Sequence, residues 1–62
     1  MEYMRKSFKT CWDALQRRGY WVDSYEPNTL EAHFMACGVC IRSKKLYFSP
    51  KGRCIRVEER NY

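Results

Sequence analysis

The chain has 62 residues, of which 12 are Lys or Arg and 7 are Asp or Glu, so its formal net charge is +5. This length predicts one domain over residues 1–62, and the 45% of hydrophobic residues excludes an intrinsically disordered composition. No apolar run approaches the roughly 20 residues of a membrane span, and no signal peptide pattern follows the N-terminus. We therefore expect a folded, cytoplasmic protein without membrane contact, whose small core depends on aromatic packing.

The first predicted element is a helix over residues 3–18. No Gly or Pro interrupts this segment, and its apolar residues recur at spacings of three and four, which is typical of one buried helix face. Gly19 follows where helices commonly end in a left-handed residue, and Arg17 and Arg18 complement the negative end of the helix dipole. The apolar stripe consists of Met4, Phe8, Cys11, Trp12 and Leu15.

After Gly19 the helical period gives way to the two-residue alternation of strands. Turn-forming residues interrupt this alternation at residues 26–29, at Gly38-Val39 and at residues 49–52. The sequence therefore predicts an α+β fold, in which the helix packs on one face of a three- to four-stranded antiparallel meander. The predicted strands cover residues 20–25, 30–37, 39–48 and 53–58, and residues 59–62 form a frayed tail.

The third predicted strand contains a change of face. Val39 and Ile41 have odd numbers whereas Leu46 and Phe48 have even ones, so either a bulge near residues 43–45 or a junction of two short strands is required. We expect the core between helix and sheet to consist of Phe8, Trp12, Leu15, Phe34, Ile41, Ile55 and Val57.

Charge is distributed unevenly along the chain. Residues 1–19 carry five basic and two acidic side chains, residues 20–37 three acidic and no basic ones, and residues 38–62 seven basic and two acidic ones. Lys and Arg bind phosphates with release of counterions, and nearby aromatic rings stack on unpaired bases. We therefore hypothesise a non-enzymatic protein, without a cofactor, that binds nucleic acid or acts as a regulatory accessory. Its predicted contacts are Arg42, Lys44, Lys45, Tyr47, Lys51, Arg53 and Arg56 of the last hairpin, with Arg17 and Arg18 at the helix end.

Two other interpretations of this surface remain open. The positive charge could simply keep the protein soluble, with Lys44 and Lys45 protecting an edge strand from pairing, although an exposed edge could also pair two chains as a homodimer. Alternatively, the protein docks on a partner protein, since exposed aromatic residues are favoured interface anchors. The interface of this alternative is an aromatic and acidic strand face formed by Trp21, Asp23, Tyr25 and Glu31.

The four cysteines and one histidine are the candidates for metal or redox chemistry. Cys37 and Cys40 have the spacing of a zinc knuckle, but a second such pair is missing from the sequence. A zinc-stabilised domain, our lesser alternative, would need the strands to bring His33, Cys37, Cys40 and Cys54 together. With Gly38-Val39 as the hairpin turn, Cys37 and Cys40 would face each other across two strands as free thiols. The one acidic candidate partner for His33 is Glu31 on the same strand face. A lone His on the outer face of a strand is usually a surface or half-buried side chain, so we predict no catalytic residue.

Overall fold

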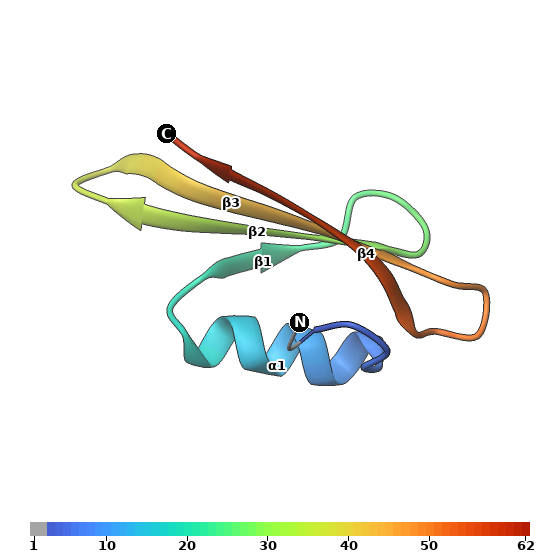
Figure 1. Cartoon of the computed structure of the whole chain (residues 1–62). Coiled ribbons are helices and arrows are strands. Elements are labelled where there is room, and N and C mark those ends of the chain that lie inside the picture. The colour runs from blue at the N-terminus through green and yellow to red at the C-terminus, as the bar shows by residue number, and fades with distance from the viewer. Residues whose placement is uncertain (1–2) are drawn as a thin grey trace.

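The structure is a computed structural model that describes residues 3–62. These residues form one helix and one four-stranded sheet. The strands pair in chain order as an antiparallel meander, and the helix packs on one face, which confirms the predicted α+β fold (Figure 1). Within the described residues no helix is long and apolar enough to cross a membrane. The elements are α1 (Phe8–Arg17), β1 (Trp21–Asp23), β2 (Thr29–Ala36), β3 (Val39–Phe48) and β4 (Cys54–Asn61).

The five residues before α1 were predicted as helix but instead lie along the start of β4. The backbone N–H of Arg5 donates to the carbonyl of Cys54 at 2.8 Å, and the N–H of Cys54 donates to the carbonyl of Lys6 at 2.9 Å. Ser7 then begins the helix, because its side chain accepts a hydrogen bond from a backbone N–H of the first turn at 3.2 Å. The apolar spacing that suggested an earlier start therefore belongs to two different local structures.

The core lies between α1 and the sheet and differs from the predicted one at three positions. Phe34 is only half-buried and does not belong to the core cluster. Ile55 is 57% exposed, because the pairing passes from Tyr47 with Arg56 to Phe48 with Cys54 and leaves Ile55 as the extra residue of a bulge. Ile41 is likewise bulged and only half-buried. The predicted residues Phe8, Trp12 and Val57 pack against the buried core, which consists of Tyr3, Cys11, Leu15, Val22, Leu30, Ala32, Leu46, Phe48 and Cys54.

The predicted change of face in the third strand occurs within one continuous strand, but at Ile41 rather than at residues 43–45. Phe34 pairs with Arg42 and Met35 pairs with Cys40, so Ile41 has no partner in β2. The bulge therefore determines which face of the sheet each later side chain of β3 occupies.

The turn between β2 and β3 is one residue earlier than predicted. Ala36 pairs with Val39, and the two residues between them, Cys37 and Gly38, both have left-handed backbone angles, with φ of 52° and 78°. This is the backbone pattern of a two-residue turn that suits the twist of a hairpin. Cys37 is therefore part of the turn. We expected it to face Cys40 across the two strands, but Cys40 pairs with Met35 instead.

Two further boundaries differ from the prediction. β1 has three residues instead of six, because the segment after it forms a compact loop. In this loop the Ser24 hydroxyl donates to the carbonyl of Thr29 at 2.8 Å, and the Thr29 hydroxyl donates to the carbonyl of Glu26 at 2.8 Å. β4 continues through most of the predicted frayed tail. The N–H of Tyr62 still donates to the carbonyl of Ile41 at 2.9 Å.

Candidate nucleic-acid interface and open sheet face

Lys44, a predicted phosphate contact, lies on the helix side of the sheet. It is directly opposite Ala32 of β2, and its ammonium group is 2.8 Å from the carboxylate of Glu59. The same ammonium is 6.0 Å from the ring centre of Tyr3 and 5.9 Å from that of Tyr20. Only 16% of the Lys44 side chain is exposed, so its position suits packing beneath the sheet rather than contact with a phosphate.

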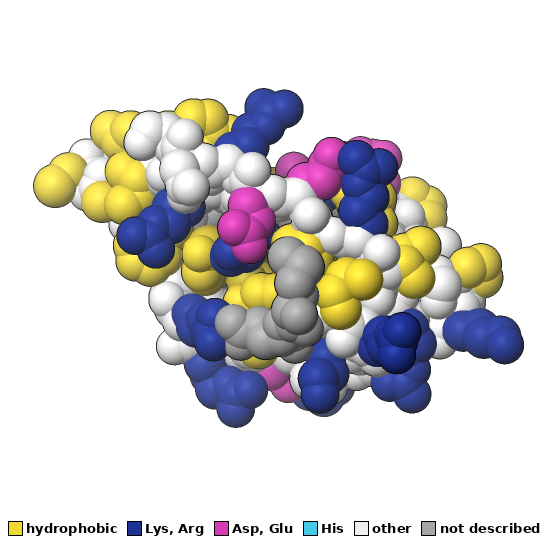
Figure 2. Space-filling model, in the orientation of Figure 1, with side chains coloured by type: hydrophobic (Ala, Val, Ile, Leu, Met, Phe, Trp, Pro, Cys, Tyr) yellow, Lys and Arg dark blue, Asp and Glu magenta, His cyan; other side chains and the backbone are white. Residues whose placement is uncertain are grey.

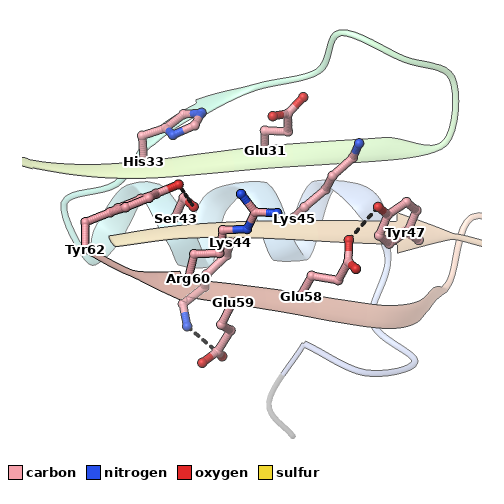
Figure 3. Close-up of a pocket in the computed structure, with 10 residues that line it drawn as sticks. All are labelled: Glu31, His33, Ser43, Lys44, Lys45, Tyr47, Glu58, Glu59, Arg60 and Tyr62. Atoms are coloured by element: carbon pink, nitrogen blue, oxygen red, sulfur yellow. Dashed lines mark hydrogen bonds and ion pairs between the residues drawn. The ribbon is translucent and has the colours of Figure 1, made fainter. Parts of the chain in front are cut away.

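Lys45, Tyr47 and Arg56 lie on the open face, the side of the sheet away from α1. Figure 3 shows Lys45 and Tyr47 on this face. The Tyr47 hydroxyl donates to Glu58 at 2.6 Å, which lowers the pKa of Glu58 and raises that of Tyr47. Arg56 pairs with the same carboxylate at 2.9 Å, and Lys45 pairs with Glu26 at 3.1 Å. Both cations also lie near the Tyr47 ring, 5.4 and 5.3 Å from its centre. A base could stack on Tyr47 only by displacing these contacts.

A shallow depression of about 460 Å³ lies over β2, β3 and β4 on this open face. In Figure 3, Glu31 and His33 rise from β2 beside Lys45 of β3, with α1 behind the sheet. Lys44 of β3 and Glu58, Glu59 and Arg60 of β4 supply the other charged residues of the lining. Acidic and basic side chains alternate across the depression, so it lacks the uniform positive charge that favours a polyanion.

Pairing between the N-terminal segment and β4 gathers cations that are far apart in the sequence. Arg53 forms a bridge with the residue before α1, and Arg5 and Lys6 contribute the backbone groups that bond to Cys54. Lys51 occupies the adjoining turn between β3 and β4, and α1 continues the exposed surface away from this turn. We call the exposed cations of this helix side the basic rim; they are Arg5, Lys6, Lys9, Arg17, Arg18, Lys51 and Arg53.

Figure 2 shows Lys and Arg side chains along the lower edge of the molecule, where α1 lies in Figure 1, and under the β3–β4 turn. Asp13 is the single acidic residue of α1, and it pairs with Lys9 at 3.1 Å in an exposed contact that contributes little to stability. Arg18 donates to the Tyr3 hydroxyl at 3.4 Å. Ten helical residues separate the two ends of the rim by roughly 15 Å.

Arg42, the remaining predicted contact, lies beyond the C-terminal end of α1. Its guanidinium is 5.7 Å from the ring centre of Phe34, whose ring meets that of Tyr20 edge-on at 5.4 Å. The predicted phosphate contacts thus fall into three groups. One is part of the basic rim (Arg17, Arg18, Lys51 and Arg53), and one belongs to the charged network of the open face (Lys45, Tyr47 and Arg56). The third, Arg42 and Lys44, lies on the helix side of the sheet beside Phe34 and Tyr20.

Trp21, Asp23, Tyr25 and Glu31, the interface of the alternative hypothesis, are brought together at the β1 edge of the open face. The Trp21 indole N–H donates to Oδ2 of Asp23 at 2.8 Å, and the Tyr25 hydroxyl donates to the same oxygen at 3.0 Å, which raises the pKa of Tyr25. Glu31 is directly opposite Asp23 in the register. Trp21 is 68% exposed and Tyr25 is 70% exposed. We call these four residues the aromatic-acidic patch.

The four residues considered for zinc do not converge. Cys54 is buried near Cys11 on the helix side of the sheet, and burial raises the pKa of both thiols. Cys40 Sγ lies 3.8 Å from Nδ1 of His33, whereas Cys37 is exposed in the hairpin turn. Among residues 3–62, no three His, Cys, Asp or Glu side chains are placed to hold a metal ion.

No protein-family model, curated protein or solved structure matches the chain. Function is therefore inferred from the two surfaces described above. We did not predict Arg5, Lys6 and Lys9 as contacts, because a continuous helix would have separated them from the last hairpin. Ser7 was the available signal, since a Ser directly before an apolar helical run is a common helix start.

Proposed function

We propose that the protein is a small, non-enzymatic nucleic-acid-binding protein whose basic rim contacts the phosphate backbone of a duplex. One observation carries this proposal: the hydrogen bonds of Arg5 and Lys6 with Cys54 bring the cations before α1 next to those of the β3–β4 turn. Together with the exposed cations of α1, they give one side of the molecule a nearly uniform positive charge.

Uniform charge matters because duplex binding without sequence preference depends on the number of phosphates that are neutralised. A DNA duplex carries one negative charge per roughly 1.7 Å of its axis, so a surface about 15 Å long meets several phosphates at once. The open face is less suitable, since Lys45 and Arg56 already pair with carboxylates there.

A duplex suits the rim better than a single strand does. Binding to unpaired bases relies on exposed aromatic rings beside the cations. The aromatic residues nearest the rim, Tyr3, Phe8 and Trp12, are buried or half-buried against the core. Contacts to phosphate alone carry no sequence information, so we expect similar affinity for duplexes of different sequence.

The proposal is tested by the salt dependence of binding to a short labelled duplex of mixed sequence. The rim variant carries Arg17→Gln and Arg53→Gln, and the matched control carries Arg56→Gln and Arg60→Gln on β4. All four arginines are exposed, and both variants lose the same net charge. Any difference between them therefore reports where the phosphates bind.

In a plot of log affinity against log salt, we expect the slope to become shallower by about 0.9 for each phosphate contact removed. Only the plot of the rim variant should therefore be clearly shallower than that of the unaltered protein. The absence of duplex binding by the unaltered protein at low salt would refute the proposal. An equal or larger loss of slope in the control would show that phosphates bind the open face and would refute the assignment to the rim.

A further inference from the structure

We propose that the aromatic-acidic patch binds an extended protein segment that carries arginine. This inference concerns the open face and does not depend on nucleic-acid binding by the rim. Asp23 is directly opposite Glu31, and Glu31 is directly opposite Lys45, whose ammonium is bound by Glu26 at 3.1 Å. Three carboxylates are thus accompanied by one ammonium group. The patch thus carries an excess of negative charge on a protein that is otherwise basic.

Asp23 and Glu31 are arranged in a way that favours an added cation. They are directly opposite each other on β1 and β2, and like charges at such positions destabilise the pairing of strands. No ion pair to either carboxylate is formed within residues 3–62. A guanidinium placed between them would relieve this repulsion.

Trp21 and Tyr25 give the site its preference for arginine. Both rings are anchored through their polar atoms to Oδ2 of Asp23, while about 70% of each side chain stays exposed. A planar guanidinium stacks on such rings and presents a fork of N–H donors to a carboxylate, which a lysine ammonium does not do. The Oδ1 atom of Asp23 accepts no hydrogen bond from the described residues, so it is open to such a donor.

An extended segment suits the position of the patch. β1 is the first strand of the sheet, and its outer edge is paired with no strand of the described chain. A peptide backbone can add to such an edge while its side chains reach the neighbouring face. Nucleic acid does not fit here, because the excess carboxylates repel phosphates.

The test uses two synthetic peptides of alternating serine and arginine, identical except that citrulline replaces arginine in the second. Citrulline has nearly the shape of arginine but no charge. Binding is followed by NMR shifts of the backbone amides of residues 21–33 in the full chain, so the Trp21→Ala variant is measured in the same way as the others. We expect the arginine peptide to bind weakly but saturably, the citrulline peptide not to bind, and Asp23→Asn or Trp21→Ala to weaken binding about fivefold or more.

Two matched controls separate the patch from the rest of the open face. Glu58→Gln removes one carboxylate of β4, opposite Lys45 of β3. Tyr62→Ala removes the aromatic ring of a residue at the chain end that is 72% exposed. We expect both controls to bind the arginine peptide as the unaltered protein does. Trp21 and Tyr62 are mostly exposed, so their replacement leaves the fold intact, which the dispersion of the amide spectrum verifies.

Several results would overturn this inference. Equal binding of both peptides would show that charge is not recognised, and an equal loss in the Glu58 variant would show that the patch is not the site. Self-association abolished by Asp23→Asn would assign the patch to a second copy instead. Duplex binding, measured on the Asp23→Asn variant, is expected to keep the salt slope of the unaltered protein, so failure here leaves the rim proposal standing.

Discussion

Lys44 and Lys45 are adjacent in the sequence but occupy opposite faces of β3. The Lys44 ammonium is enclosed by Glu59 and two tyrosine rings, whereas Lys45 reaches across the open face to Glu26. Two-residue alternation predicts opposite faces for adjacent residues, but the sequence could not predict which lysine lies on which face. The face of each lysine depends on the bulge at Ile41, and a shift of one residue exchanges the two faces of a strand.

The two lysines should therefore contribute differently to stability. We expect Lys44→Ala to lower the free energy of unfolding by about 1–2 kcal/mol, because the packed stem and a partly buried ion pair are lost together. Lys45→Ala should cost less than about 1 kcal/mol, as exposed ion pairs do. Urea denaturation of both variants measures the difference, and equal losses would contradict the placement of Lys44 beneath the sheet.

Cys11 gives the protein a defined dependence on alkaline pH. Burial, assisted by the nearby Cys54, raises the pKa of the Cys11 thiol from 9.0 to about 11. Above pH 9.0 the unfolded chain releases this proton while the folded chain retains it, so stability falls as the pH rises. We expect Cys11→Ala, whatever its packing cost, to make the decline of unfolding free energy above pH 9.0 shallower. An equally steep decline in the variant would show that Cys11 is not responsible.

At the scale of elements, local patterns predicted what local interactions determine. Two-residue alternation and turn residues were sufficient for the meander, because each hairpin joins neighbouring strands. They were not sufficient for the segment before α1, which pairs with residues more than 40 positions away. Nothing in the helical spacing of Met4 and Phe8 distinguishes a continued helix from a chain that turns to meet β4.

The N-terminal segment should accordingly be as important to stability as a strand. Tyr3 is only 4% exposed, so we expect Tyr3→Ala to lower the free energy of unfolding by about 3 kcal/mol, as for other buried aromatic residues. Tyr25→Ala is the matched control, since Tyr25 is 70% exposed and should cost about 0.5 kcal/mol. Thermal or urea unfolding measures the two losses of free energy. A loss at Tyr3 as small as that at Tyr25 would contradict the packing of this segment against the core.

For the molecule as a whole, the net charge of +5 is the result of two unlike surfaces. The basic rim follows α1 and the β3–β4 turn (Figures 1 and 2). The aromatic-acidic patch lies on the open face of the sheet beside β1. Charge counts along the sequence indicated an acidic middle and basic ends. They could not indicate that Lys44 and Lys45 would be paired, because Lys44 binds Glu59 across two strands and Lys45 binds Glu26 of the loop before β2.

The central claim is that phosphates meet the basic rim and not the strands of the last hairpin. Backbone amide shifts recorded by NMR during titration of the full chain with a short duplex test it directly. We predict the largest shifts in residues 5–9, 17–18 and 51–53, with small ones in residues 43–47 and 56–60. Shifts concentrated in residues 43–47 and 56–60, with the rim unaffected, would contradict it.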